Sequence, residues 1–497
     1  MGSSIVTLPE FLQSARHAGY QSLAHAIAEL VDNAIQAEAS TIAVRVGHGA
    51  SGPEIDVQDD GVGMDDSTLA RALCFGGSSR YGDRSGMGRF GMGLPSSSLS
   101  QARCVEVYSW RATNRVRLVR FDLDELLAGS QELEPPRSVD LPPAATAPGP
   151  RGTVVRWTRC DQLAGQRPGS LARDLSRSLG RTFRRFIWGG LALTVNGAAC
   201  PPLDPLLLDP RAPASGAVRF GAQLRLPVRT ALGEGTVAAV FSELPVQLWH
   251  GLSLAEKRRV GITKGGGVSV MRAEREVDVG WFFMGEKRRE SYDDWWRCEI
   301  SFPPTLDEAF GLTYTKQQIR PTSELIEALT PYVSAVAHAL NGRVRRAHQT
   351  LQVRERFSAS EVRATSVESR LRPLPAPTST TSALAARVAA RWPDVLVPPA
   401  SPDVRIIEDD LGPAPVFELL QVKNRLLVIW NTAHPFYQRA YAPLAASSEP
   451  GSAQRRAHLE LLVVALAREE AARGAGPPGV EEFRHAWSET LAELIKD

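Results

Sequence analysis

The sequence predicts an α+β protein with three structured parts. Residues 1–197 alternate helical and strand patterns, and positions 21–38 place apolar residues near helical spacing. Residues 198–321 are rich in strand patterns, and a long helical pattern follows over 322–357. Helices and strands in this order indicate that the first part is an α/β sandwich.

The sequence of the last part of the chain predicts a linker followed by a small module. Residues 358–402 are rich in Ser, Thr, Pro and Ala, which is typical of a flexible linker. Residues 403–497 predict a C-terminal α/β module in which strand-like runs precede two helical patterns. Pro331 and Gly342 interrupt the long helical pattern before the linker, so that it is either one helix or two.

Composition excludes several classes of protein. The 497 residues include 57 basic and 55 acidic residues, and this balance does not favour a nucleic-acid-binding tail or a membrane-surface protein. The five cysteines are scattered without metal-ligand spacing, so neither a zinc site nor a disulfide framework is expected. No signal-peptide pattern or membrane-spanning apolar run is found, and a reducing cytoplasm is the expected compartment.

Lysine is scarce and unevenly placed. The chain has six lysines among its 57 basic residues, and none precedes position 257. A GC-rich genome is one cause, since it favours arginine codons. Any lysine chemistry must nevertheless come from the middle or the end of the chain. The lysines are Lys257, Lys264, Lys287, Lys316, Lys423 and Lys496.

The first motif with chemical potential is "ELVDNA" at positions 29–34. On a helix, Glu29 and Asn33 are four residues apart and lie on the same face. A carboxylate there can orient and deprotonate a water, while an amide oxygen can bind a hard cation such as Mg²⁺. A solvent-facing polar stripe is the alternative when the motif is taken alone.

The second motif is "DDGVGM" at positions 59–64, directly after a strand pattern. A carboxylate at a strand end can accept a hydrogen bond from an exocyclic amine, and the glycines let the backbone approach a flat ring. An ordinary Asp-Gly turn is the alternative.

The third motif is "GMGRFGMGL" at positions 86–94, before a helical pattern. Glycines that open a helix expose N–H groups to a phosphate. The motif is neither a Walker loop nor a dinucleotide fingerprint, because no Gly-Lys-Ser/Thr follows and no βαβ unit surrounds it.

In this order and spacing the three motifs resemble the GHKL ATPase superfamily, which includes gyrase B subunits, MutL, heat-shock-ninety chaperones, histidine kinases and MORC proteins. The resemblance covers about residues 10–197, is especially close to the bacterial MORC/MutL-like branch, and implies a Bergerat-fold ATPase domain. Gly152-Thr153, at the start of a later strand, fits the threonine motif of that superfamily.

The resemblance implies a role for each matching residue. Glu29 is expected to be the general base and Asn33 the Mg²⁺ ligand, while Asp59 is expected to bind the adenine amine with support from Thr153. Residues of about 65–87 are expected to form the ATP lid. The remaining residues expected to bind ATP are Gly61, Gly63, Met64, Ser78, Ser79, Gly88, Arg89, Phe90, Gly91, Met92, Gly93 and Leu94. Pro95 departs from many MORC relatives, which have a lysine here; either Arg89 supplies the charge or none is needed.

Residues 198–321 resemble, more loosely, the ribosomal-protein-like transducer domain of gyrase, MutL and MORC proteins. "GVSVMRAEREVDVG" predicts a hairpin with its turn near Ala273–Glu274. In gyrase-like and MutL-like relatives a lysine of this domain reaches back into the ATP site, and Thr315-Lys316-Gln317 resembles that loop. Lys316 is therefore expected to contact the γ-phosphate, with Lys264 as the competing candidate.

The expected function is an ATP-operated, dimerising clamp or switch that hydrolyses ATP with Mg²⁺. Its client is expected to be nucleic acid, in a setting such as antiphage defence, with operon-encoded proteins as further partners. One alternative is a heat-shock-ninety-like chaperone whose client surface includes Trp295, Trp296 and the segment 280–285. Another is a non-catalytic nucleotide-binding scaffold, against which the intact Glu29 and Asn33 argue. The basic residues of the long helix, Arg343, Arg345, Arg346, Arg354 and Arg356, are either a phosphate-binding stripe or a solvated helix face.

Overall fold

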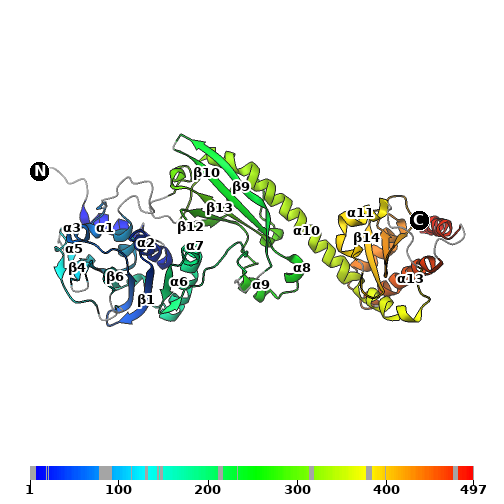
Figure 1. The fold of residues 1–497 in the computed structure, drawn as a ribbon, viewed down its shortest axis with the longest axis horizontal. Helices are drawn as coiled ribbons and strands as arrows, with labels where there is room; N and C mark the ends of the chain where they lie inside the picture. The colour runs from blue at the N-terminus through cyan, green and yellow to red at the C-terminus, as the bar shows by residue number, and fades with distance from the viewer. Residues whose placement is uncertain are drawn as a thin grey trace. The chain divides into compact units, whose positions relative to one another are not determined.

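The computed structural model has the mixed α+β architecture that the sequence predicts, and it separates into two compact units, residues 1–344 and 345–497 (Figure 1). Among the residues that the structure describes, no helix combines the length and apolar character that a membrane crossing requires. The described residues are 7–17, 19–20, 22–77, 92–112, 115–128, 132–142, 145, 149–210, 216–231, 233–312, 318–375, 383–397, 399–473 and 479–495.

The first sheet of unit 1 has eight strands in the order β5-β4-β3-β6-β2-β1-β7-β8. All neighbouring strands are antiparallel except β1 and β7, which are parallel. The strands are β1 (Thr41–Gly49), β2 (Gly52–Asp59), β3 (Cys104–Trp110), β4 (Arg117–Asp122), β5 (Arg137–Ser138), β6 (Gly152–Thr158), β7 (Ala192–Val195) and β8 (Ala198–Ala199).

Helices cover one face of this sheet, and the buried core lies between them and the strands. On α2, Ile27, Leu30 and Val31 face the core, while Ser22 caps the helix by accepting a hydrogen bond from the His25 amide. The helices of this part are α1 (Leu8–His17), α2 (Leu23–Gln36), α3 (Asp66–Ala72), α4 (Gly93–Gln101), α5 (Leu123–Leu127), α6 (Pro168–Thr182) and α7 (Arg184–Trp188), with a 3₁₀ turn at Asp161–Leu163.

The second sheet of unit 1 has five strands in the order β12-β11-β13-β10-β9. As predicted, β11 and β12 form a hairpin whose turn is Ala273–Glu274, and both turn residues have positive φ angles of 46° and 68°. The strands are β9 (Val218–Thr230), β10 (Gly233–Glu243), β11 (Val268–Arg272), β12 (Arg275–Gly280) and β13 (Trp296–Phe302). The short helices α8 (Val246–Trp249) and α9 (Leu254–Val260) and the 3₁₀ turn Ser291–Trp295 lie between them in the chain, and the 3₁₀ turn Pro304–Leu306 follows β13.

The long helical pattern forms one helix, α10 (Ser323–Val367), which contains Pro331 and continues through Gly342. The sequence predicts a separate helical segment over 322–357. In the structure the helix is longer, and its first half packs into the core of the second sheet. The residues that do so recur at spacings of three and four, as a helix face requires: Leu325, Leu329, Val333, Ala337 and Leu340. The two units divide within this helix, after Val344.

Unit 2 has a three-stranded sheet in the order β14-β16-β15, surrounded by helices. Strand β16 is the central strand and is buried along its whole length, with Trp430 in the middle of the core. The elements are β14 (Asp403–Asp409), β15 (Phe417–Val422), β16 (Arg425–Asn431), α11 (Ala383–Arg391), α12 (Ala442–Ala446), α13 (Ser452–Arg473) and α14 (Val480–Leu494). Shorter turns are Glu368–Arg370, Pro393–Leu396 and the π-helical Tyr437–Tyr441.

The structure differs from the prediction that 358–402 is a flexible linker. Residues 358–367 continue α10, and α11 places Val388 in a buried cluster with Trp392 and Leu427. The composition that indicated flexibility includes many alanines, and alanine also favours helices. The few large apolar residues of this stretch are enough to pack its helix against unit 2. This stretch therefore belongs largely to unit 2.

Candidate nucleotide site

The candidate site begins on α2, which holds Glu29 and Asn33 four residues apart, as predicted. Glu29 is buried and Asn33 is partly exposed. The Tyr20 hydroxyl lies beside Glu29, and burial together with this carboxylate raises its pKa. Tyr20 therefore stays protonated, as a neutral neighbour of Glu29. Sequence reasoning missed Tyr20, because a tyrosine before a helix carries no signal of which side chain it will touch.

The end of the glycine-rich motif packs directly against Glu29. Gly93 is the first residue of α4, and a Cβ atom added there would lie 2.1 Å from Oε1 of Glu29. Only glycine therefore fits at this position while the carboxylate keeps its place. Met92 precedes the helix without a side-chain cap, so the first N–H groups of α4 can bind an anion near the same carboxylate. Leu94 follows in the first turn, and Pro95 needs no partner there because it has no N–H.

The two aspartates after β2 have different environments. Asp59 is partly buried at the strand end, and burial raises its pKa to about 6, although amide N–H groups of Gly61 and Thr153 act in the opposite direction. Asp60 accepts hydrogen bonds from Ser40 and Thr41 at the start of β1. Burial acts to raise the pKa of Asp60, but these hydrogen bonds outweigh it and lower that pKa. Asp60 therefore stabilises the start of β1, whereas Asp59 can still accept hydrogen bonds from a ligand.

A small polar cluster adjoins Asp59 in the middle of the sheet. Thr153 is opposite Asp59 on β6, and its Oγ1 lies 3.1 Å from Oγ of Ser109 on β3. The Met64 amide donates to the same Ser109 oxygen over 2.8 Å. Ser109 thus joins the second motif to the threonine motif. Sequence reasoning missed it, because only the strand register brings this serine to the site.

Glycines of the second motif are required by close packing within the chain. A Cβ at Gly63, whose φ is 67°, would lie 2.2 Å from the Trp110 carbonyl oxygen, and a Cβ at Gly61 would lie 2.7 Å from that of Ala37. The sequence argument assigned these glycines to close approach of a ligand ring. In the structure the close approach that excludes a side chain is to the protein's own backbone.

Several expected site residues lie outside the described residues, and the structure therefore says nothing of them. They are Ser78, Ser79, Gly88, Arg89, Phe90, Gly91 and Lys316.

Residues 198–321, which include the second sheet of unit 1, are called the second domain below. Its described lysines differ in their freedom to reach a ligand. Lys287 is buried and forms an ion pair of 2.6 Å with Asp293. Lys257 donates to the His250 carbonyl oxygen over 2.5 Å. Lys264 is exposed, and its loop precedes β11 at the end of the hairpin away from the Ala273–Glu274 turn.

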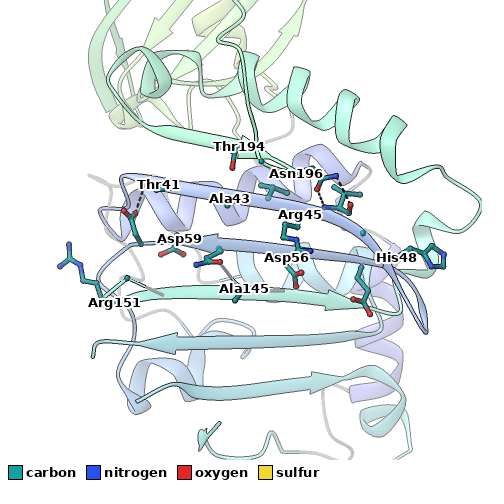
Figure 2. A pocket seen from close by; sticks show the side chains of 18 residues that line it. Thr41, Ala43, Arg45, His48, Asp56, Asp59, Ala145, Arg151, Thr194 and Asn196 are labelled. Carbon is teal, nitrogen blue, oxygen red and sulfur yellow. Dashed lines mark hydrogen bonds between the residues drawn. The ribbon is translucent and has the colours of Figure 1, made fainter. Parts of the chain in front are cut away.

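A hollow lies on the face of the first sheet opposite the helices (Figure 2). It has a volume of about 1010 Å³, and Arg45, Asp56 and Asn196 are among its lining residues. Side chains alternate along β2, so that Ile55 and Val57 face the helices while Asp56 faces this hollow. Glu29, Gly93 and Asn33 are not among the residues that line this hollow, whereas Asp59 is.

The residue types around Glu29 fit an ATP site that works with Mg²⁺. Asn33 offers a hard oxygen ligand, and among the described residues no cluster of three His, Cys, Asp or Glu side chains is placed to hold a metal by itself. Magnesium in such a site is held by one or two protein oxygens together with the phosphates of the nucleotide, where it neutralises their charge. A buried carboxylate, an uncapped helix start and a strand-end aspartate are the kinds of group that a nucleotide-phosphate hydrolase site would use.

Comparison with known proteins agrees with this class. Residues 20–141 match the family model of histidine kinase-, DNA gyrase B- and HSP90-like ATPases, which is less than half of the chain. This part of the chain is therefore similar to GHKL-type ATPase domains, and the match supports ATP binding and hydrolysis. No curated protein sequence matches the chain. Among solved structures, the N-terminal domain of a DNA repair protein is 14% identical with a TM-score of 0.44, over 66% of this chain and 98% of that chain. That likeness does not bear on function.

Proposed function

We propose that the protein is an Mg²⁺-dependent ATPase in which ATP binding and hydrolysis operate a dimerising clamp or switch. The observation that carries the proposal is the packing of Glu29 against Gly93, which joins the expected general base to the expected phosphate-binding helix start. Asp59 and Thr153, with Ser109 beside them, supply the acceptors expected for the adenine amine.

The proposed reaction needs few steps from the protein itself. Glu29 orients a water and takes its proton as the water attacks the γ-phosphorus, while the bond from the γ-phosphorus to the bridging oxygen breaks and ADP leaves. The Tyr20 hydroxyl stays protonated beside Glu29 and so does not compete with this carboxylate as a base. Asn33 holds Mg²⁺, and the N–H groups that open α4 bind phosphate oxygens.

Lys316 remains our candidate for the γ-phosphate contact. Two of the described lysines of the second domain, Lys257 and Lys287, are engaged inside that domain, which leaves Lys264 as the described alternative. Four residue steps of strand separate the two ends of β11, or about 13 Å, so Lys264 lies well away from the turn that contacts the first domain. We expect Lys316→Ala to lower turnover with little loss of nucleotide affinity, and Lys264→Ala to have no such effect.

The decisive test is Glu29→Ala. The variant is expected to bind ATP with near wild-type affinity and to lose hydrolysis, while Glu10→Ala, an exposed glutamate of α1, serves as the matched control. Unchanged turnover in Glu29→Ala would remove Glu29 from its role. Sedimentation with and without a non-hydrolysable ATP analogue tests the dimer, which is expected only with the analogue.

We propose nucleic acid as the client, with defence against phage as the setting and operon-encoded proteins as further partners. The basic run of α10 gives mixed support. Arg343 pairs with Glu243 within unit 1, and Arg356 pairs with Glu408 within unit 2, so these two charges are partly neutralised. Salt-dependent DNA binding in the presence of the ATP analogue is expected; no binding at low salt would refute this part.

The burial of the proposed client surface argues against the chaperone alternative. Trp295, Trp296, Phe283 and Met284 are buried, and three of them belong to the core of the second sheet. The segment that was a candidate client surface is therefore largely interior.

A further inference from the structure

An arginine of the second domain reaches the helix that carries Glu29. The tight turn at Ala273–Glu274 places Arg275 at the start of β12, with only 3% of its side chain exposed. Its Nε lies 3.0 Å from Oδ1 of Asp32, which is fully buried on α2. The guanidinium also lies 5.8 Å from the centre of the Phe183 ring.

Asp32 stands between Glu29 and Asn33 in the chain, so its partner acts on the turn of α2 that holds both. A buried charge without a partner is very unfavourable, and the helix therefore keeps the rotation that lets Asp32 meet Arg275. Tyr20 lies within electrostatic reach of both Glu29 and Asp32. Burial raises the pKa of its hydroxyl, the neighbouring Glu29 and Asp32 raise it further, and Arg275 opposes them. Arg275 therefore lies within electrostatic reach of the Glu29–Tyr20 pair.

A second residue of the same strand acts electrostatically on α2. Burial lowers the pKa of His25 on α2, with Arg275 adding to this effect and Asp278 of β12 opposing it. Asp278 also accepts a hydrogen bond of 2.9 Å from the amide of Ile319. In sequence, Ile319 follows Lys316 by three positions. Strand β12 thus connects α2 to the chain segment that leaves the expected lysine loop.

Other ion pairs join the two domains without touching α2. Arg184 is fully buried and binds Glu276 and Glu299, and Arg185 binds Glu274 and Glu299. These contacts dock α7 onto the second sheet. The pair of Arg275 with Asp32 is thus an additional contact, aimed at the helix that carries the expected base.

We propose that Arg275 is a positioning residue for ATP hydrolysis, which fixes the orientation of α2 and of Glu29 through its ion pair with Asp32. This inference rests on the proposed ATPase function. If Arg275 has this role, ATP turnover requires the second domain to pack against α2, because the second domain supplies the Arg275 charge. A small rotation of α2 would move Glu29 away from the attacking water, and displacements of about 1 Å can lower rates about a hundredfold.

The test compares Arg275→Met, Arg275→Lys, Asp32→Asn and the double variant Asp32→Asn/Arg275→Met in the full chain. Arg185→Met is the matched control, since it removes an ion pair of the same interface without touching α2. Each protein is assayed for steady-state ATP hydrolysis, for affinity toward a fluorescent non-hydrolysable ATP analogue, and for thermal unfolding.

We expect each single substitution at Arg275 or Asp32 to lower kcat at least about tenfold, with analogue affinity changed less than about threefold. Arg275→Lys should recover part of the loss, because it keeps the charge without the planar fork. The double variant should regain thermal stability, since neither charge is left alone, but not kcat. Arg185→Met should keep wild-type kcat.

Two results would overturn the inference. If kcat returns together with stability in the double variant, the pair is only structural. If Arg185→Met loses as much kcat as Arg275→Met, docking as a whole matters rather than the contact with α2. Failure of the ATPase proposal is distinct: the wild type would then show no hydrolysis, or Glu29→Ala would hydrolyse ATP as fast as the wild type.

Discussion

Replacing Asp59 by asparagine should stabilise the protein without nucleotide and abolish its response to nucleotide. The pKa of Asp59 is about 6 against an ordinary value of 3.8, a difference of about 2 units. At about 1.4 kcal/mol per unit, keeping this carboxylate ionised in the folded chain costs at most about 3 kcal/mol. Burial is the main cause, and asparagine has the same shape without the charge.

The sign of the pH dependence follows from the raised pKa. The protonated carboxyl favours the folded state, so the contribution is complete below about pH 4 and is lost as the pH rises through about 6. The free energy of unfolding of Asp59→Asn should therefore equal that of the wild type at about pH 4. It should exceed the wild-type value by up to about 3 kcal/mol at about pH 8, or roughly 6–12 °C in Tm for a domain of this size.

Calorimetric unfolding across this pH range, with and without an ATP analogue, is the assay. Analogue at a hundred times its Kd should stabilise the wild type by about 2.7 kcal/mol and leave Asp59→Asn nearly unchanged, because the variant presents an amide group in place of the carboxylate that we propose accepts from the adenine amine. Asp60→Asn is the matched control with the opposite sign: the pKa of Asp60 is lowered, so this variant should be less stable than the wild type at neutral pH and approach it in acid. A pH-independent difference for Asp59→Asn, or a loss of stability at about pH 8, would refute the reasoning.

Further substitutions test the site and the two units separately. Gly93→Ala places a methyl group where the Glu29 carboxylate lies and should lower ATP turnover at least about tenfold, as measured against an unchanged far-ultraviolet circular dichroism spectrum. Ser109→Ala leaves the Met64 amide without its acceptor and should cost about 1–3 kcal/mol in unfolding free energy, together with weaker analogue binding; full retention of both would exclude the cluster from the site. Arg184→Met removes one of the two arginine partners of each of two buried glutamates, Glu276 and Glu299, and should cost about 3–5 kcal/mol in urea unfolding of unit 1. Trp392→Ala should cost about 3–5 kcal/mol in unit 2 while ATP hydrolysis stays at the wild-type rate, and a stable variant would return residues 383–397 to the status of a linker. Chelation of Mg²⁺ with EDTA should abolish hydrolysis, and added Mg²⁺ should restore it.

Local patterns in the sequence were enough to predict the secondary elements that hold the site. The spacing of Glu29 and Asn33 depends only on the helical period, and the turn at Ala273–Glu274 depends on a short-range hairpin signal. The linker prediction failed because composition reports local preference, whereas the burial of Val388 depends on a strand that follows it by about forty residues. Composition alone does not show that a distant apolar surface exists to receive a helix.

The sequence by itself determined the class of the site, because order and spacing within about 130 residues carry the expected base, the metal ligand, the adenine acceptor and the glycines. The tertiary structure alone decided which polar side chains meet. Ser109 joins Thr153 only through strand register, Tyr20 lies beside Glu29 only through helix packing, and Arg275 reaches Asp32 across 243 positions of chain. The ion pair of Arg275 with Asp32 forms only when the second domain packs against α2. A buried charge must have a partner, and a local sequence pattern does not show which charges packing will bury.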